Sequence, residues 1–138
     1  VVGDRLDTDI AGANAAQLPS LMVLCGVNTA ADAIWAAPQE RPDYIGEDLR
    51  ALTADAGALR VAPHPGWRVD LEEGVVTVRS TGDDPGDALA VVRAIAAAVW
   101  AADDDRRSSI IRAGDDDARQ AVERWSLVAA AGGEGALA

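Results

Sequence analysis

The sequence predicts an α/β fold, in which a parallel sheet with helices is followed by a small α+β module. Over residues 1–57, short apolar runs alternate with helix-forming segments, which is the pattern of strand–helix–strand units. From residue 58 onward, strands with alternating apolar and polar residues replace that pattern and indicate a sheet with one buried face. We therefore expect residues 1–57 to form one unit, residues 58–128 a second, and residues 129–138 a flexible tail.

The first unit is expected to contain three strands and three helices. The strands are apolar runs over residues 1–3, 21–24 and 43–45. The helices follow them, one starting near residue 10, one over residues 32–37 and one over residues 47–56. Thr8 or Asp9 is expected to cap the first helix. Pro38 stops the second helix, and Gly57 closes the third.

The second unit is expected to contain a hairpin and a long helix. Its strands cover residues 59–61, 67–71 and 75–79, and a tight turn at residues 72–74 joins the last two. The helix is expected to begin near Pro85 and to run to about Ala102, because proline is favoured in a first turn. Its buried stripe consists of apolar residues at helical spacing: Leu89, Val92, Ile95, Ala96 and Val99.

The last elements are a short strand or turn over residues 108–112 and a helix over residues 115–128. In that helix Val122, Trp125 and Leu127 are the candidates for burial. The sequence contains no Phe, so we expect the core to be anchored by its four tryptophans: Trp35, Trp67, Trp100 and Trp125.

The composition excludes several classes of partner. The chain has 12 basic and 23 acidic residues and a net charge of −11, so it has no basic stripe for nucleic acid or for anionic membranes. The longest apolar stretch, residues 88–102, is interrupted by Arg93 and is too short to cross a bilayer. Cys25 is the only cysteine, which excludes an internal disulfide and indicates a reducing, cytoplasmic location.

The most informative residues lie at the start of the chain. The first apolar run ends at Gly3, and two carboxylates, Asp4 and Asp9, follow it. Open α/β sheets place their ligands at the carboxyl ends of the strands, and hard oxygen ligands beside a helix N-terminus suit Mg²⁺ and a phosphate. The alternative is an ordinary pair of helix-start aspartates, with Arg5 and Asp7 either fixing the loop or simply solvated.

This run resembles the fourth motif of the haloacid-dehalogenase-like (HAD) hydrolases, Gly-Asp-x-x-x-x-Asp, matched by Gly3, Asp4 and Asp9. The fuller form, Val-Gly-Asp-Arg-Leu-x-Thr-Asp-Ile, is closest to the subfamily of p-nitrophenyl-phosphatase-like, phosphoglycolate and glycerol-phosphate phosphatases. The resemblance continues to about residue 56. It implies the C-terminal strands and helices of a three-layer Rossmannoid sheet.

The same resemblance implies a function. Members of this family are Mg²⁺-dependent phosphomonoester phosphatases that act through an aspartyl-phosphate. The substrate class implied is a small phosphate ester, such as glycerol phosphate or phosphoglycolate. By this resemblance Asp4 would be the metal ligand, with Asp9 supporting the site directly or through water.

Other parts of the family's site are not matched in this sequence. The family's nucleophilic aspartate lies in an Asp-x-Asp-Gly-Thr motif, and a Lys binds the phosphoryl group; the 138 residues contain neither that motif nor any Lys. The resemblance therefore implies a C-terminal piece of a longer enzyme, with the nucleophile and the cap domain on other sequence. We expect this piece alone to be inactive.

Residues 79–86 carry a second, weaker resemblance. They join a predicted strand to a predicted helix, and their opening Arg-x-x-Gly resembles the acetyl-CoA loop of acetyltransferases. Asp84 stands where that pattern needs Gly or Ala, and Asp83 and Asp87 would repel a pyrophosphate. We expect a module with an acetyltransferase-like outline and no active acetyltransferase site.

A function of a different class is an interaction or dimerisation role for residues 58–138. On this view the face formed by Trp67, Val69 and Leu71 contacts a partner or a second copy of the chain.

Three remaining features have plain interpretations. Cys25 is expected to be a buried or half-buried structural thiol, and His64 a loop residue in a Pro-His-Pro-Gly turn. The aspartate runs at residues 103–105 and 115–117 lack the spacing of a calcium loop, and are interpreted as a solvated loop and a helix start.

Overall fold

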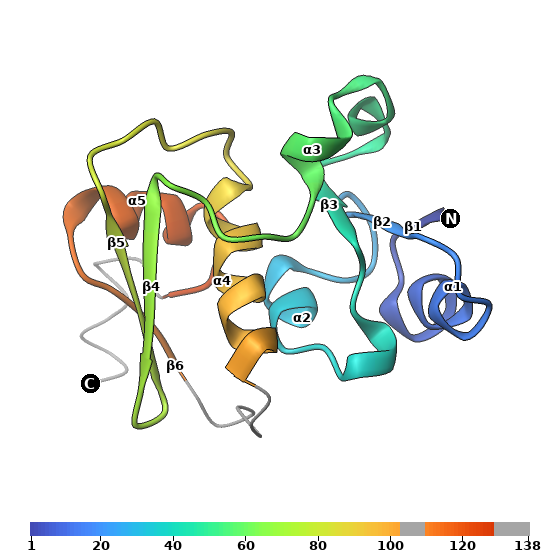
Figure 1. Ribbon diagram of the computed structural model, residues 1–138, viewed down its shortest axis with the longest axis horizontal. Helices are drawn as coiled ribbons and strands as arrows, with labels where there is room; N and C mark the ends of the chain where they lie inside the picture. Colours follow the sequence, from blue (N-terminus) through green and yellow to red (C-terminus); the bar gives the residue numbers. More distant parts are fainter. Residues whose placement is uncertain (103–109, 129–138) are drawn as a thin grey trace.

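The computed structural model describes residues 1–102 and 110–128 and contains two three-stranded sheets with helices between and around them (Figure 1). The first sheet has the order β1-β2-β3 and the second the order β4-β5-β6. Helix α4 lies between the two sheets and contacts elements of both halves (Figure 1). The predicted α/β fold is confirmed.

The first sheet is parallel throughout. Its strands are short: β1 (Val2–Gly3), β2 (Leu21–Val23) and β3 (Tyr44–Gly46). All three residues of β2 are buried, as its unbroken apolar run predicts. Because the strands are parallel, the segments that follow all three lie at one edge of the sheet, which is where ligands bind in such folds.

The first helix starts earlier than predicted. A π-helical turn (Leu6–Ile10) leads directly into α1 (Ala11–Ala15), with Arg5 in the cap position. The expectation that Thr8 or Asp9 caps a helix starting near Ile10 is therefore wrong. Both residues lie inside the turn, and the Ile10 N–H reaches back to the carbonyl of Arg5 (3.1 Å).

The second helix, α2 (Ala30–Ile34), starts at a capping box. The Thr29 hydroxyl accepts from the Asp32 N–H (3.2 Å), and the Asp32 carboxylate accepts from the Thr29 N–H (2.9 Å). The helix ends before the predicted residue 37, and Pro38 opens a separate 3₁₀ turn (Pro38–Glu40).

The predicted helix over residues 47–56 is wrong. The chain forms a 3₁₀ turn (Leu49–Thr53), becomes extended at Ala54 and Asp55, and then forms α3 (Ala56–Leu59), so Gly57 lies inside a helix. The Thr53 hydroxyl donates to the carbonyl of Arg50 (2.9 Å), a local bond that competes with helix continuation. The predicted strand over residues 59–61 is reduced to one bridge between Arg60 and Tyr44.

The hairpin of the second sheet agrees with its prediction. Strands β4 (Trp67–Glu72) and β5 (Val75–Ser80) are antiparallel and are joined by Glu73 and Gly74, both with positive φ (50° and 79°). Strand β6 (Ile110–Ala113) pairs with β5 in parallel, which decides the strand-or-turn alternative in favour of a strand; residues 108–109 lie outside the described residues. Helix α5 (Asp116–Glu123) ends before the predicted residue 128.

Helix α4 (Ala90–Ala102) begins five residues after Pro85, so its predicted start is wrong. Gly86 has a φ of +74°, and the side chains of Asp84 and Asp87 accept from the N–H groups of Gly86 (2.9 Å) and Leu89 (3.1 Å). These local bonds make residues 84–89 a turn rather than a helical segment. Among the described residues no helix is both long and apolar enough to cross a membrane.

The core runs continuously through both halves. The predicted stripe of α4 is confirmed as buried, and the opposite side of the helix is buried as well, at Ala90, Val91 and Ala94. One hydrophobic cluster joins residues of the first half to residues of the second: Ile10, Met22, Ile34, Ile45, Val76, Val78, Ile95 and Val122. The two halves are therefore not separate in their packing.

Of the four tryptophans expected to anchor the core, Trp67 is buried, and Trp35, Trp100 and Trp125 are partly buried and pack against it. Three indole N–H groups donate to backbone carbonyls: Trp67 to Pro85 (2.9 Å), Trp100 to Ile34 (3.0 Å) and Trp125 to Ala88 (2.8 Å). Trp67 is buried, and Val69 and Leu71 are partly buried against the chain's own core. The expectation that this face contacts a partner stays a prediction.

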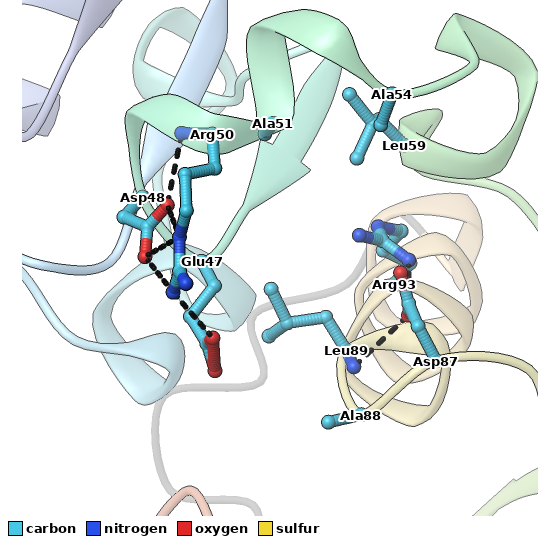
Figure 2. A pocket seen from close by; sticks show the side chains of 10 residues that line it. All are labelled: Glu47, Asp48, Arg50, Ala51, Ala54, Leu59, Asp87, Ala88, Leu89 and Arg93. Atoms are coloured by element: carbon cyan, nitrogen blue, oxygen red, sulfur yellow. Dashed lines mark hydrogen bonds and ion pairs between the residues drawn. The ribbon is translucent and has the colours of Figure 1, made fainter.

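Arg93 joins α4 to the last strand of the first sheet. Its side chain is 4% exposed; Nε donates to the carbonyl of Ile45 (2.9 Å), and Nη1 pairs with Asp87 (2.7 Å). Figure 2 shows the Asp87–Arg93 pair on one wall of a cavity, opposite Glu47, Asp48 and Arg50 of the first half. A buried charge with these partners fixes how the helix sits on the sheet.

Candidate metal-binding site

Asp4 lies directly after β1, at the carboxyl edge of the first sheet, and is half-buried. Its Oδ2 accepts from the N–H of Val27 (3.3 Å), in the loop that follows β2. A Cβ atom at Gly26 would overlap the Asp4 carboxylate, so this carboxylate occupies space that only a glycine leaves open. The loop that follows the neighbouring strand thus sets the position of the Asp4 side chain.

Asp9 folds back over the end of β1. Its Oδ2 accepts from the N–H of Arg5 (3.3 Å), and a Cβ atom at Gly3 would overlap its side chain. Asp9 is half-buried like Asp4. The structure therefore holds both predicted site residues at the end of the same strand, each packed against a glycine.

Arg5 is turned toward Asp7 and not toward these two carboxylates. Its Nη2 lies 3.1 Å from Asp7 Oδ2, and both side chains are well exposed. The hydrogen bond and charge of Asp7 raise the pKa of the Arg5 guanidinium, and the charges of Asp4 and Asp9 add smaller contributions. Arg5 therefore pairs with Asp7 of its own loop at the solvent-exposed surface, and a role in fixing the loop stays a prediction.

The donor set fits a hard divalent cation. Two carboxylates with restricted positions stand at a strand end, and Mg²⁺ in proteins typically uses one or two carboxylates together with waters and phosphate oxygens. Within residues 1–102 and 110–128, no three His, Cys, Asp or Glu side chains gather closely enough to hold a metal by themselves. This part of the chain therefore offers part of a coordination shell.

The loop after β2 contributes residues that the sequence reasoning missed. Gly26 makes room for Asp4, and the backbone N–H of Asn28 donates to the Asp4 carbonyl (3.2 Å). The available signal was the position of Gly-Val-Asn directly after the second strand, since neighbouring parallel strands end at the same edge.

The other residues singled out in the sequence, Cys25, His64 and Asp115, lie in loops or at a helix start. Cys25 is exposed, so the prediction of a buried or half-buried thiol is wrong; the buried run of β2 ends two residues before it. His64 lies in a loop, as predicted, where its Nδ1 accepts from the Gly66 N–H (3.0 Å). Asp115 caps α5 by accepting from the Ala118 N–H (2.8 Å), which agrees with a helix start. Residues 103–105 lie outside the described residues.

The acetyltransferase-like loop leads into α4, as the resemblance requires. A cavity beside it is lined by Asp83, Asp87 and Asp117, together with Arg124 and the side of Trp67. Three carboxylates beside one guanidinium give the cavity an acidic character, which disfavours a pyrophosphate.

Comparison with known families agrees with both halves. Residues 1–52 match the model described as HAD-hydrolase-like, and residues 64–127 match the model described as a GCN5-related N-acetyltransferase like domain. Together with the fold and the edge position of Asp4, the first match shows that residues 1–52 are similar to the C-terminal part of the HAD-like hydrolases, and a further module follows them.

The relatives are more specific. The chain is 57% identical over 136 residues to D-glycerol 3-phosphate phosphatase of Mycobacterium tuberculosis, a match that covers 93% of this chain and 38% of that protein. Two crystal structures of glycerol phosphate phosphatase from the same organism are also similar. The complex with magnesium has a TM-score of 0.85 and the complex with calcium 0.86, both at 58% identity, over 93% and 94% of this chain but 37% and 39% of theirs. The chain thus spans less than two fifths of the length of these relatives.

Proposed function

We propose that this chain is part of a Mg²⁺-dependent phosphomonoester phosphatase of the HAD-like class. The observation that carries the proposal is the Asp4 carboxylate, held at the carboxyl end of β1 against Gly26 and the N–H of Val27. The identity to a glycerol phosphate phosphatase, and the magnesium in a related structure, support the choice of reaction and of cation.

In this proposal Asp4 holds the metal and Asp9 supports it. When bound, Mg²⁺ would supply positive charge that offsets the charge of the phosphate ester. The chain's own part is to fix the two carboxylates: Gly26 and Val27 set the position of Asp4, and Gly3 and the Arg5 N–H set that of Asp9. Restricting ligands before the metal arrives reduces the entropy lost on binding.

The substrate proposed is a small phosphate ester, of which glycerol phosphate has the direct support of the relatives' names; phosphoglycolate rests on the sequence resemblance alone. The aspartyl-phosphate mechanism needs a nucleophilic aspartate and a Lys, and the 138 residues contain neither Asp-x-Asp-Gly-Thr nor Lys. We therefore place these groups on sequence outside the 138 residues and propose that this polypeptide alone does not hydrolyse p-nitrophenyl phosphate. We also propose a cytoplasmic location. The boundary between the HAD-like part and the second module is placed between residues 57 and 58 in the same proposal.

The test is a Mn²⁺ titration of the 138-residue chain followed by heteronuclear NMR, because Mn²⁺ shares the oxygen ligands of Mg²⁺ and broadens nearby amide signals. We expect selective broadening at residues 3–5 and 26–28, reversed by excess Mg²⁺ and lost in Asp4→Asn. Asp7→Asn is the matched control, since it removes a neighbouring carboxylate outside the proposed site. Broadening that is unchanged in Asp4→Asn would show that the ion binds elsewhere.

Dimerisation is the alternative role. The face first expected for it, formed by Trp67, Val69 and Leu71, is in part occupied by the chain's own core. Light scattering of the intact chain over a range of concentrations decides whether a homodimer forms.

A further inference from the structure

Asn28 makes two hydrogen bonds that connect the loop after β2 to the loop after β1, and a third that connects it to α2. Its side-chain Oδ1 accepts from the N–H of Leu6 (2.8 Å), and its backbone N–H donates to the carbonyl of Asp4 (3.2 Å). Its Nδ2 donates to Oδ2 of Asp32 (3.1 Å), in the capping box of α2. No local element explains the Leu6 bond, because 22 positions separate the two residues in the chain.

These bonds enclose Asp4. One is made to the carbonyl of Asp4 itself, and another to the N–H two residues later, so the backbone on the carboxyl side of Asp4 is fixed at both points. The N–H of Val27, the residue before Asn28, contacts the Asp4 carboxylate. A shift of the backbone at Asn28 would therefore also shift the Val27 N–H that donates to Asp4 and the space that Gly26 leaves for its carboxylate.

An asparagine side chain is suited to this position. Its amide group has an acceptor oxygen and a donor nitrogen, so it can accept from Leu6 and donate to Asp32 at the same time. An aspartate would keep the acceptor but lose the donor, and would place a second carboxylate beside that of Asp32. An alanine would leave the half-buried Leu6 N–H without its partner, which costs more than the loss of an exposed bond.

We propose that Asn28 is a positioning residue for the metal site: it holds the Asp4 loop on the loop after β2 and so sets the position of the Asp4 carboxylate before the cation binds. This rests on the proposed function only in that Asp4 is taken as the metal ligand. Residues around metal ligands that orient them commonly change metal affinity by about 10- to 100-fold when removed.

Asn14 provides a matched control. It is also an asparagine whose amide bridges distant backbone, with Nδ2 donating to the carbonyls of Gln39 (2.8 Å) and Arg41 (3.1 Å). It lies on α1 and makes none of the Asp4 contacts. Asn14→Ala therefore removes comparable hydrogen bonds without touching the proposed site.

The experiment compares the wild-type chain, Asn28→Ala, Asn28→Asp and Asn14→Ala by Mn²⁺ titration with NMR and by hydrogen exchange of the metal-free proteins. We expect Asn28→Ala to weaken Mn²⁺ binding at residues 3–5 about tenfold and to speed exchange of the Leu6 amide. Asn28→Asp should keep the slow Leu6 exchange, since its carboxylate can accept that bond. Asn14→Ala should leave Mn²⁺ affinity unchanged even if its melting temperature falls as far as that of Asn28→Ala.

The outcomes separate the two claims. A wild-type chain without selective broadening at residues 3–5 overturns the metal site itself, and with it the proposed function. Selective broadening in the wild type, together with equal Mn²⁺ affinity in folded Asn28→Ala, overturns the role of Asn28 alone. If Asn14→Ala weakens Mn²⁺ binding as much as Asn28→Ala, the effect is general destabilisation, and the positioning role is wrong.

Discussion

The two sheets of this molecule differ in the length of their strands and of the segments that connect them. In the first sheet the strands β1, β2 and β3 are two or three residues long, and long connecting segments carry Asp4, Gly26 and Asn28 to one edge. In the second sheet β4 and β5 are six residues each and are joined by a two-residue turn. Short strands provide few ladder bonds, so the sheet that presents the candidate site has the least backbone pairing of its own.

The second half provides packing contacts for the first half, whose own strands are short. Helix α4 is buried on both sides, because it covers the second sheet and also packs on α2 and α3 of the first half (Figure 1). Arg93 extends this packing to a direct bond with the backbone of β3. The second half therefore packs against the half that carries Asp4 and shares one hydrophobic core with it.

The largest effect is expected from breaking that connection. Arg93→Met removes a buried guanidinium and leaves the Ile45 carbonyl without its donor, so we expect the free energy of unfolding in urea to fall by about 3 kcal/mol. Asp87 is half-exposed and can be solvated, which limits the loss. Signals from both sheets should still disappear in one transition at a lower urea concentration.

Arg68→Met is the control for this prediction. Arg68 pairs with Asp70 on the surface, at 3.0 Å, and its loss should change the free energy of unfolding by about 0.5 kcal/mol or less. Equal stability of Arg93→Met and Arg68→Met would mean that the bond from Arg93 to the Ile45 carbonyl does not hold the halves together. Two separate transitions in the wild type would contradict the shared core.

A more local effect is expected at the carboxyl edge of the first sheet. Gly26→Ala places a methyl group where the Asp4 carboxylate lies and should weaken Mn²⁺ binding by about tenfold or more, by displacing the ligand. Gly26 does not have a positive φ, so the expected cost is steric and not a matter of backbone conformation. The measurement is the Mn²⁺ titration described above.

Gly12→Ala is the matched control. Its Cβ would meet nothing within 4 Å, and an alanine inside α1 should stabilise the chain slightly without changing Mn²⁺ affinity. If Gly26→Ala binds Mn²⁺ as tightly as Gly12→Ala, the space that Gly26 leaves for the Asp4 carboxylate is not required for metal binding.

The smallest effect is expected from pH. The pKa of Asp48 is lowered to about 2, chiefly by hydrogen bonds from Arg50, and that of Asp32 is lowered, chiefly by the backbone bond from Thr29. A carboxyl group with a lowered folded-state pKa stabilises the fold above its unfolded pKa, near 4, and loses this contribution as pH falls toward the folded value. Both groups belong to the first half.

We therefore expect the melting temperature to fall between about pH 4 and pH 2, and to fall less steeply in Asp48→Asn. Because Asp48 is solvent-accessible, the difference should be small. Thermal unfolding at several pH values tests this, with Asp55→Asn as the control. A steeper fall in Asp48→Asn than in the wild type would contradict the sign of the effect.

Much of the fold could be predicted from local pattern. The unbroken apolar run of β2 and the alternation around Glu73 and Gly74 carry their own strand signals, and both elements lie where the sequence places them. The misplaced helix ends have local causes that pattern does not weigh: the hydroxyl of Thr53 breaks one predicted helix, and Asp84 and Asp87 turn the chain before α4.

Part of the candidate site could be predicted from the sequence, and part could not. The motif of Asp4 and Asp9 is contiguous in sequence and could be found there, and its role as a metal site stays a prediction. The contribution of Asn28 could not be predicted, because its bond to Leu6 exists only when two parallel strands bring their ends together. Cys25 is exposed because it lies in the loop after β2 and not in the buried strand.

The most direct test is diffraction from crystals of the chain grown or soaked with Mn²⁺, using the anomalous signal of the ion. We predict an anomalous peak within coordinating distance of an Asp4 carboxylate oxygen, at about 2.0–2.3 Å, with Asp9 in contact directly or through water. A peak coordinated by other residues, or no peak beside Asp4 when Mn²⁺ is bound in solution, would contradict it.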